Sequence, residues 1–187
     1  MLEQHAVVLE DVLPLSLEKG QVDPARRGRL MLDNLALLKA LLVMDDHLLM
    51  EDDNREAISS LETKIDLLLL LVGKGIQGLE PLPTSYSCAL GAEDLYWETE
   101  SSAGFPHEHG PVCVALFLRP RIAMPLFLPG TLQMSVTQPE GSAETLLRFH
   151  LHFQLDTRVQ ESLDRLIFRH HRRSIARQKD HHHLSAE

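Results

Sequence analysis

The chain of 187 residues is long enough for one ordinary domain with an addition, and 44% hydrophobic with 24% charged residues is typical of a soluble globular protein. Its formal net charge of -9 argues against nucleic-acid binding, which needs a broad basic surface. The two cysteines, Cys88 and Cys113, stand too far apart for a metal-ligand or redox motif and suit a reducing compartment.

The first twenty residues, "MLEQHAVVLEDVLPLSLEKG", carry acids where a secretory signal carries positive charge. The longest leucine run extends from Leu67 to Val72, far short of the roughly 18 apolar residues that indicate a membrane span. We therefore expect a cytoplasmic protein without a membrane span, with residues 1–22 as an N-terminal segment.

Residues 23–78 predict a pair of long helices. Asp23 followed by Pro24 is a helix start signal, because the carboxylate accepts free amide hydrogens and proline fits the first turn. The apolar residues that follow form two neighbouring stripes, so this helix needs several neighbours. The stripes are Leu30, Leu37, Leu41 and Met44, and Met31, Leu35, Leu38 and Leu42.

A second helix is predicted after the acidic turn around 45–54, and it carries a seam with coiled-coil spacing. The seam consists of Ile58, Leu61, Ile65, Leu68 and Val72. These helices could form a hairpin folded onto their own chain, which is the usual meaning of such a pattern. Leucines on both flanks of the seam, however, leave more apolar surface than one hairpin buries, which favours a homo-oligomer.

From residue 79 to 187 the sequence predicts a small antiparallel barrel or sandwich followed by a helix, so the fold class is α+β. Short strand-like runs with turn residues between them indicate the barrel. These runs are "LYWETE", "VCVALFL", "MPLFL", "LQMSV" and "LLRFHLHFQL", and the turn residues include Pro129 and Gly130. In the last run, Phe149, Leu151 and Phe153 alternate with polar residues, which predicts one buried face.

The final helix is predicted to begin near Thr157, which has capping-box spacing with Gln160. Its buried stripe comprises Val159, Leu163, Leu166, Ile167 and Ile175, and its other side carries Arg165, Arg169, Arg172 and Arg173. A run of charges of this kind usually forms a solvated face, and we expect that here.

The helix "SLDRLIFRHHRRSIARQ", preceded by a strand ending in "HFQLD", resembles the PilZ domains of bacterial cyclic di-GMP signalling. The leucine-rich helices and the early "VLPLSLE" resemble the atypical, tetramer-forming branch of that family. The resemblance implies a PilZ-like barrel with a C-terminal helix, joined by its helical region into a homotetramer.

Ligand-binding PilZ domains carry an R-x-x-x-R pair before the barrel and a D/N-x-S-x-x-G turn. Here "GKGIQGLEPLPTSYS" contains no arginine, and the turn keeps only Ser101 and Gly104, with Thr99 in place of the acid or amide. Arg169, Arg173 and Arg177 repeat the arginine spacing on the last helix and form a candidate cationic ridge for phosphates.

No metal site or catalytic motif emerges from the sequence. His150 and His152 share a strand face, but no third ligand is tied to them by spacing. We expect no enzyme activity and no cofactor, cyclic di-GMP being the one ligand that the resemblance raises. The resemblance implies a regulatory adaptor in cyclic di-GMP control of motility, adhesion or virulence. Its partner would be a protein from a signalling, pilus or flagellar pathway. The alternative is a cyclic di-GMP receptor that binds the nucleotide with the arginines of the last helix.

Overall fold

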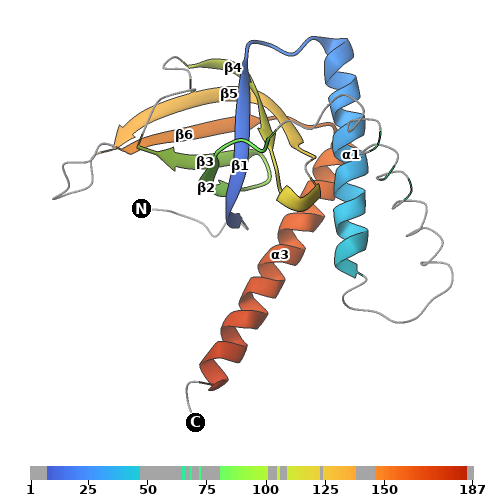
Figure 1. Cartoon of the computed structure of the whole chain (residues 1–187), viewed down its shortest axis with the longest axis vertical. Helices are drawn as coiled ribbons and strands as arrows, with labels where there is room; N and C mark the ends of the chain where they lie inside the picture. The colour runs from blue at the N-terminus through green and yellow to red at the C-terminus, as the bar shows by residue number, and fades with distance from the viewer. Residues whose placement is uncertain are drawn as a thin grey trace.

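The structure is a computed structural model. It describes residues 8–46, 65, 68, 72, 81–100, 105, 109–122, 124–137 and 146–184, with the backbone alone at 46 and 176–184. Six strands and two long helices follow one another along the chain (Figure 1). In order they are β1 (Leu9–Lys19), α1 (Pro24–Asp46), β2 (Ser85–Leu90), β3 (Asp94–Thr99), β4 (Gly110–Leu116), the 3-10 turn η1 (Pro120–Ile122), β5 (Leu126–Thr137), β6 (Leu146–Phe153) and α3 (Thr157–Leu184).

The strands close into an antiparallel barrel in the order β1-β2-β3-β6-β5-β4. β1 completes the barrel because its first half pairs with β2 and its second half with β4. This strand lies within residues 1–22, which the sequence did not predict to be part of the barrel. The barrel therefore takes strands from both sides of α1.

The barrel interior is filled by alternating side chains, as the sequence predicted for β6. Phe149, Leu151 and Phe153 are fully buried, and the ring of Phe149 stacks on that of Trp97 with 5.2 Å between centroids. The polar residues between them point outward, so the predicted alternation is confirmed.

β5 corrects one prediction, because "MPLFL" and "LQMSV" form one strand rather than two. Pro129 and Gly130 do not break the strand; near them β5 changes partner, from β4 to β6. The backbones approach so closely there that a Cβ on Gly130 would lie 2.3 Å from the carbonyl oxygen of His152. Only glycine fits this crossing.

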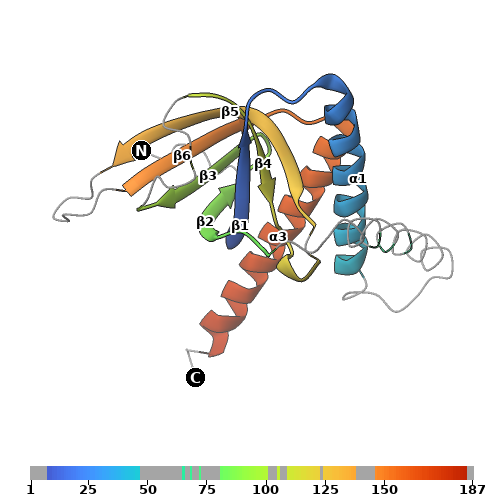
Figure 2. The same cartoon turned by 45° about the horizontal axis from the view of Figure 1, so that its top comes forward.

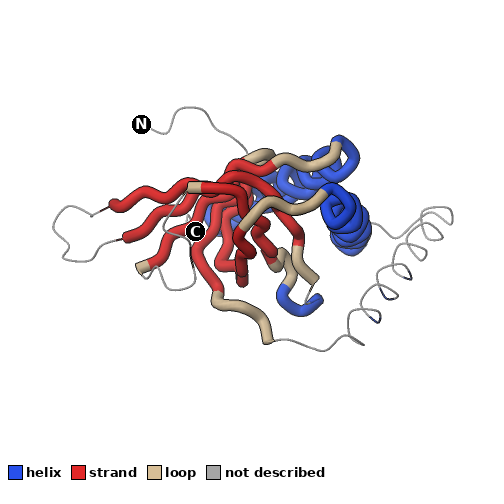
Figure 3. The backbone as a smooth tube through the Cα atoms, turned by 90° about the horizontal axis from the view of Figure 1, so that it is seen from above, coloured by secondary structure: helices blue, strands red, loops and turns tan. Residues whose placement is uncertain are grey.

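Helix α1 begins as predicted. The carboxylate of Asp23 accepts a hydrogen bond from the backbone N–H of Arg26 at 3.0 Å, and Pro24 is the first helical residue. Leu37, Leu38 and Leu41 are buried, because α1 packs against both β5 and α3. Seen from above, α1 stands beside the strands (Figure 3).

A buried amide attaches α1 to the barrel. Asn34 is completely buried; its Nδ2 donates to the carbonyl oxygen of Phe127 at 2.7 Å, and its Oδ1 accepts from the Phe127 N–H at 2.8 Å. Phe127 lies before the point where β5 starts to pair with β6. Asn34 therefore takes the place of a strand partner for this residue.

Helix α3 crosses the barrel and then extends away from it (Figures 1 and 2). Val159, Leu163, Leu166 and Ile167 are buried, as predicted. Ile175 is 41% exposed, which contradicts its assignment to the buried stripe. The helix starts at Thr157, and the side chain of Gln160 donates to the carbonyl oxygen of Ala92 instead of completing a capping box.

Little of the predicted second helix falls within the described residues. Ile58 and Leu61 lie outside them, whereas Ile65, Leu68 and Val72 are helical and exposed. Between β1 and β2 the described residues define the bounds of one helix, α1, so the hairpin remains a prediction.

The Asn34 contact gives a first test. Asn34→Ala removes two hydrogen bonds and leaves two buried backbone groups of Phe127 without this partner, so the free energy of unfolding should fall by about 3 kcal/mol. Chemical denaturation measures it. Leu32→Ala, at an exposed position on the same helix, is the control and should change stability by about 0.5 kcal/mol or less; equal effects of the two changes would contradict the role of Asn34.

Candidate functional site

The candidate ligand residues from the sequence fall into two groups. Ser101 and Gly104 lie outside the described residues. Arg169, Arg173 and Arg177 all lie on α3, but the side chain of Arg177 is not described. The structure therefore defines the surroundings of Arg169 and Arg173.

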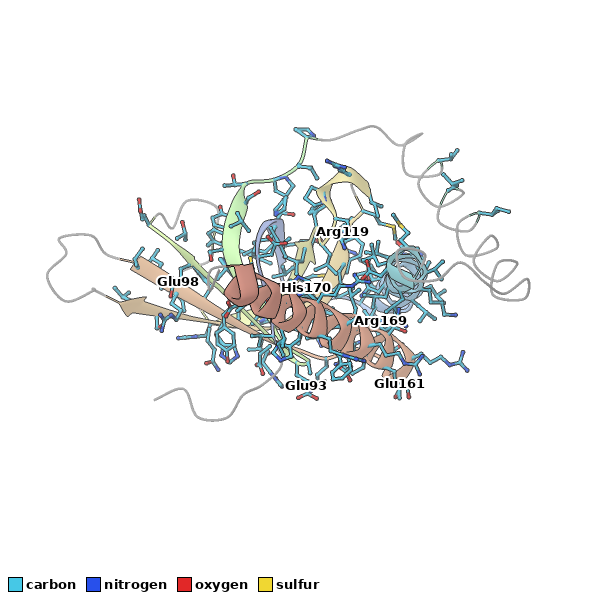
Figure 4. The ribbon with its side chains drawn as sticks, turned by 90° about the horizontal axis from the view of Figure 1, so that it is seen from below. Glu93, Glu98, Arg119, Glu161, Arg169 and His170 are labelled. Atoms are coloured by element: carbon cyan, nitrogen blue, oxygen red, sulfur yellow. The ribbon has the colours of Figure 1, made fainter. Side chains whose placement is uncertain are left out.

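Both arginines contact the C-terminal end of α1. Arg169 donates from Nη1 to the carbonyl oxygen of Leu42 at 3.1 Å, and Arg173 donates from Nη2 to that of Asp45 at 2.9 Å. The last carbonyl groups of a helix have no partner within it and carry partial negative charge. The two guanidinium groups thus close the end of α1, and Figure 4 shows Arg169 and Arg119 on either side of that end.

The side chain of Asp45 lies at the centre of this contact. It is 8% exposed; its Oδ2 lies 2.8 Å from Nη1 of Arg173, and its Oδ1 lies 3.3 Å from Nη2 of Arg119, which precedes η1. A buried carboxylate without partners is costly, and two guanidinium groups offset that cost. We call Asp45, Arg119, Arg169 and Arg173 the α1-end cluster.

The expectation of a solvated arginine face is wrong for Arg169 and Arg173. Both are partly buried and engaged with α1, whereas Arg165 and Arg172 are exposed as expected. One hint of this is present in the sequence, since the C-terminal end of a predicted helix attracts cations. Which arginines contact the end of α1 depends on how α1 and α3 pack together, and the spacing of residues along one helix does not predict this.

A second polar group lies on the outer face of β3 and β6. Nε2 of His150 lies 2.6 Å and Nδ1 of His152 lies 3.2 Å from the same oxygen, Oδ1 of Asp94. The ring of Tyr96 stacks on His150 at 4.5 Å. Within the described part of the chain no group of three or more histidine, cysteine or acidic side chains is arranged to hold a metal ion.

The two cysteines are buried inside the fold and are not paired. Burial raises the pKa of Cys88 to about 12 and that of Cys113 to about 11. Because the thiolate is the reactive form, neither thiol is suited to nucleophilic or redox chemistry near neutral pH.

Comparison with known families identifies the architecture. Residues 38–180 match the family model described as "Atypical PilZ domain, cyclic di-GMP receptor". The chain belongs to the atypical PilZ family. The match includes the end of α1, barrel strands β2 to β6 and most of α3, so the α1-end cluster lies within the matched region.

A solved structure shares the fold. It is a protein from Xanthomonas campestris described as a tetrameric PilZ domain that self-assembles through an unusual helical bundle. The TM-score is 0.61, sequence identity is 22%, and the alignment covers 91% of each chain. No curated protein matches the chain. Among its described helices, none is both long enough and apolar enough to cross a membrane.

The α1-end cluster gives a second prediction. Replacing Arg169 and Arg173 together with glutamine should lower the free energy of unfolding by about 2 kcal/mol, because Asp45 stays buried with fewer cationic partners. The matched control replaces the exposed Arg165 and Arg172 with glutamine and should cost about 0.5 kcal/mol or less. Denaturation curves of the two double variants decide this, and equal stability would restore the solvated-face interpretation.

Proposed function

We propose that this atypical PilZ protein is a non-enzymatic regulatory adaptor that works as a homo-oligomer and does not bind cyclic di-GMP in the ordinary PilZ manner. The observation that carries the proposal is the engagement of Arg169 and Arg173 with the end of α1. Guanidinium groups that close a helix end and neutralise Asp45 are not free to grip phosphates.

The residues before the barrel support the same view. The segment from Gly73 to Ser87 contains no arginine, whereas ordinary ligand-binding PilZ domains carry an arginine pair there. Holding a compact dianion with two guanine bases takes guanidinium groups that reach both phosphate and base. The segment before β2 has no arginine, and the two described arginines of the candidate ridge on α3, Arg169 and Arg173, are engaged with α1.

The proposed assembly rests on the exposed seam. Ile65, Leu68 and Val72 are helical, spaced to share one helix face, and 45 to 60% exposed. Apolar side chains at this spacing call for a partner surface, and the Xanthomonas protein with the same fold is described as a tetramer joined by a helical bundle. We propose that the seam joins copies of this chain into a tetramer.

The wider role that we propose is supported by membership of the family alone. An adaptor of this kind would act in the cytoplasm and present its barrels to a protein of a signalling, pilus or flagellar pathway. Through that protein it would influence motility, adhesion or virulence in response to cyclic di-GMP.

A variant with two charges in the seam, compared with a control variant outside it, tests the assembly. Val72→Glu, made together with Leu68→Glu, should convert the oligomer to smaller species, because unpaired charges in an apolar seam are costly to bury. Val136→Glu is the control, since Val136 on β5 has 62% exposure against 60% for Val72. Light scattering should show dissociation only for the seam variant; a wild-type monomer at micromolar concentration would contradict the proposal.

Calorimetric titration with cyclic di-GMP at physiological salt tests the ligand prediction. We expect no binding in the low-micromolar range, because the arginines that could meet the phosphates are engaged with α1. Low-micromolar binding that is lost in the Arg169→Gln, Arg173→Gln variant and kept in the Arg165→Gln, Arg172→Gln control would contradict the adaptor proposal. It would establish the alternative, a receptor that uses α3.

A further inference from the structure

The connections from β1 to α1 and from β6 to α3 both run near the start of α1 (Figure 2). A hollow of about 690 Å³ is lined by residues of both connections. Its size falls in the range of small-molecule sites. His152, which lines the hollow, pairs with Asp94, the first residue of β3. Thr99, the first residue of the expected ligand motif, is the last residue of β3, so the hollow lies at the opposite end of that strand. It is therefore separate from the expected PilZ ligand turn.

Arg27 is a positioned cation in this hollow. Its Nη2 donates to the carbonyl oxygen of Gln154 at 3.0 Å, which fixes the guanidinium between α1 and the end of β6. The group has five N–H donors, and the described residues provide no ion pair for it. Asp23, which also lines the hollow, has its carboxylate turned to the backbone N–H of Arg26 at 3.0 Å.

His152 faces the same hollow from β6. Its Nδ1 contacts Asp94 at 3.2 Å, and Nε2 has no partner among the described residues. A carboxylate that accepts from one ring nitrogen orients the imidazole, and the other nitrogen donates to an anion in the cationic form of the ring, which carries hydrogen on both nitrogens. Thr131, opposite His152 in the β5–β6 register, adds a hydroxyl group to the lining.

The rest of the lining is mixed: Gln21 and Gln154 are polar, and an apolar part is made of prolines and valines. Pro24, Pro111 and Pro129 come from three different elements, and Val22 and Val112 lie beside them. Proline rings hold their backbone in one conformation, so the hollow is largely preformed. Because Asp23 already accepts from the first turn of α1, the guanidinium of Arg27 rather than the helix amides would meet an anion.

We propose that this hollow binds a small organic phosphate ester, with the phosphate held by Arg27, His152 and Thr131 and the organic part against the proline walls. Guanidinium groups form paired hydrogen bonds to phosphate oxygens, and an imidazole and a hydroxyl complete the set. The apolar walls give an ester an advantage over the free ion.

Phenyl phosphate is the probe, titrated against the full-length protein by ligand-observed saturation-transfer NMR and calorimetry. For a ligand of this size we expect saturable binding with a Kd of about 1 mM or below. Inorganic phosphate and benzoate run in parallel and should bind about tenfold more weakly, the first for lack of an apolar body and the second for lack of the third oxygen and second charge.

Arg27→Gln should weaken phenyl phosphate binding about tenfold, whereas Arg29→Gln, at an exposed position on the same helix outside the lining, should leave it unchanged. Thr131→Val keeps the strand shape, removes the hydroxyl and should weaken binding several-fold; it serves as the second variant if Arg27→Gln does not fold. No saturable binding of phenyl phosphate, equal binding of inorganic phosphate, or equal affinity in the Arg27 and Arg29 variants would each overturn the proposal.

Discussion

The contact between Asn34 and Phe127 determines how the helices attach to the barrel. β5 leaves one neighbour and joins another along its length, and near the crossing its backbone has polar groups that no strand covers on that side. The amide of Asn34 supplies both a donor and an acceptor to Phe127. Because α1 is anchored at this point, its apolar faces pack against β5 and α3, and its C-terminal end contacts Arg169 and Arg173 of α3.

The α1-end cluster gives the arginines of α3 a structural task. In ordinary PilZ domains arginines recognise phosphate groups, and here two of them bind the carbonyl groups and the carboxylate at the end of a helix. The same property serves both purposes, since a planar fork of donors suits any cluster of oxygen atoms. The cluster holds α1, η1 and α3 together at Asp45, where the acidic segment begins. The barrel and the helical region are therefore joined by ionic contacts as well as by the chain.

Local patterns in the sequence were sufficient for several elements. The start of α1 at Asp23 and Pro24, the alternation of Phe149, Leu151 and Phe153, and most of the apolar stripe of α3 follow from spacing alone. Ile175 departs from its stripe because α3 has by then passed beyond the barrel, and periodicity does not show where a neighbour ends.

Features that depend on distant parts of the chain were not predictable in this way. The place of β1 in the barrel rests on pairing with β2 and β4. The burial of Asp45 rests on Arg119 and Arg173, which are 74 and 128 residues away. For the candidate site, spacing identified Arg169 and Arg173 as a pair but not what they bind. Arg27 and His152, far apart in sequence, were not grouped at all.

The position of β1 has a consequence for how the protein forms as it is synthesised. β1 leaves the ribosome well before its partners, β2 and β4, which begin at Ser85 and Gly110. Until β2 and β4 emerge, the leucines of β1 cannot be buried in the barrel. Until β5 emerges, Asn34 of α1 cannot bind the backbone of Phe127. Closing such a long loop is slow, since its entropy is lost before any contact compensates. Nascent chains therefore pass through a stage in which an apolar strand and an apolar helix are exposed together, which is when chaperones or neighbouring nascent copies would meet them.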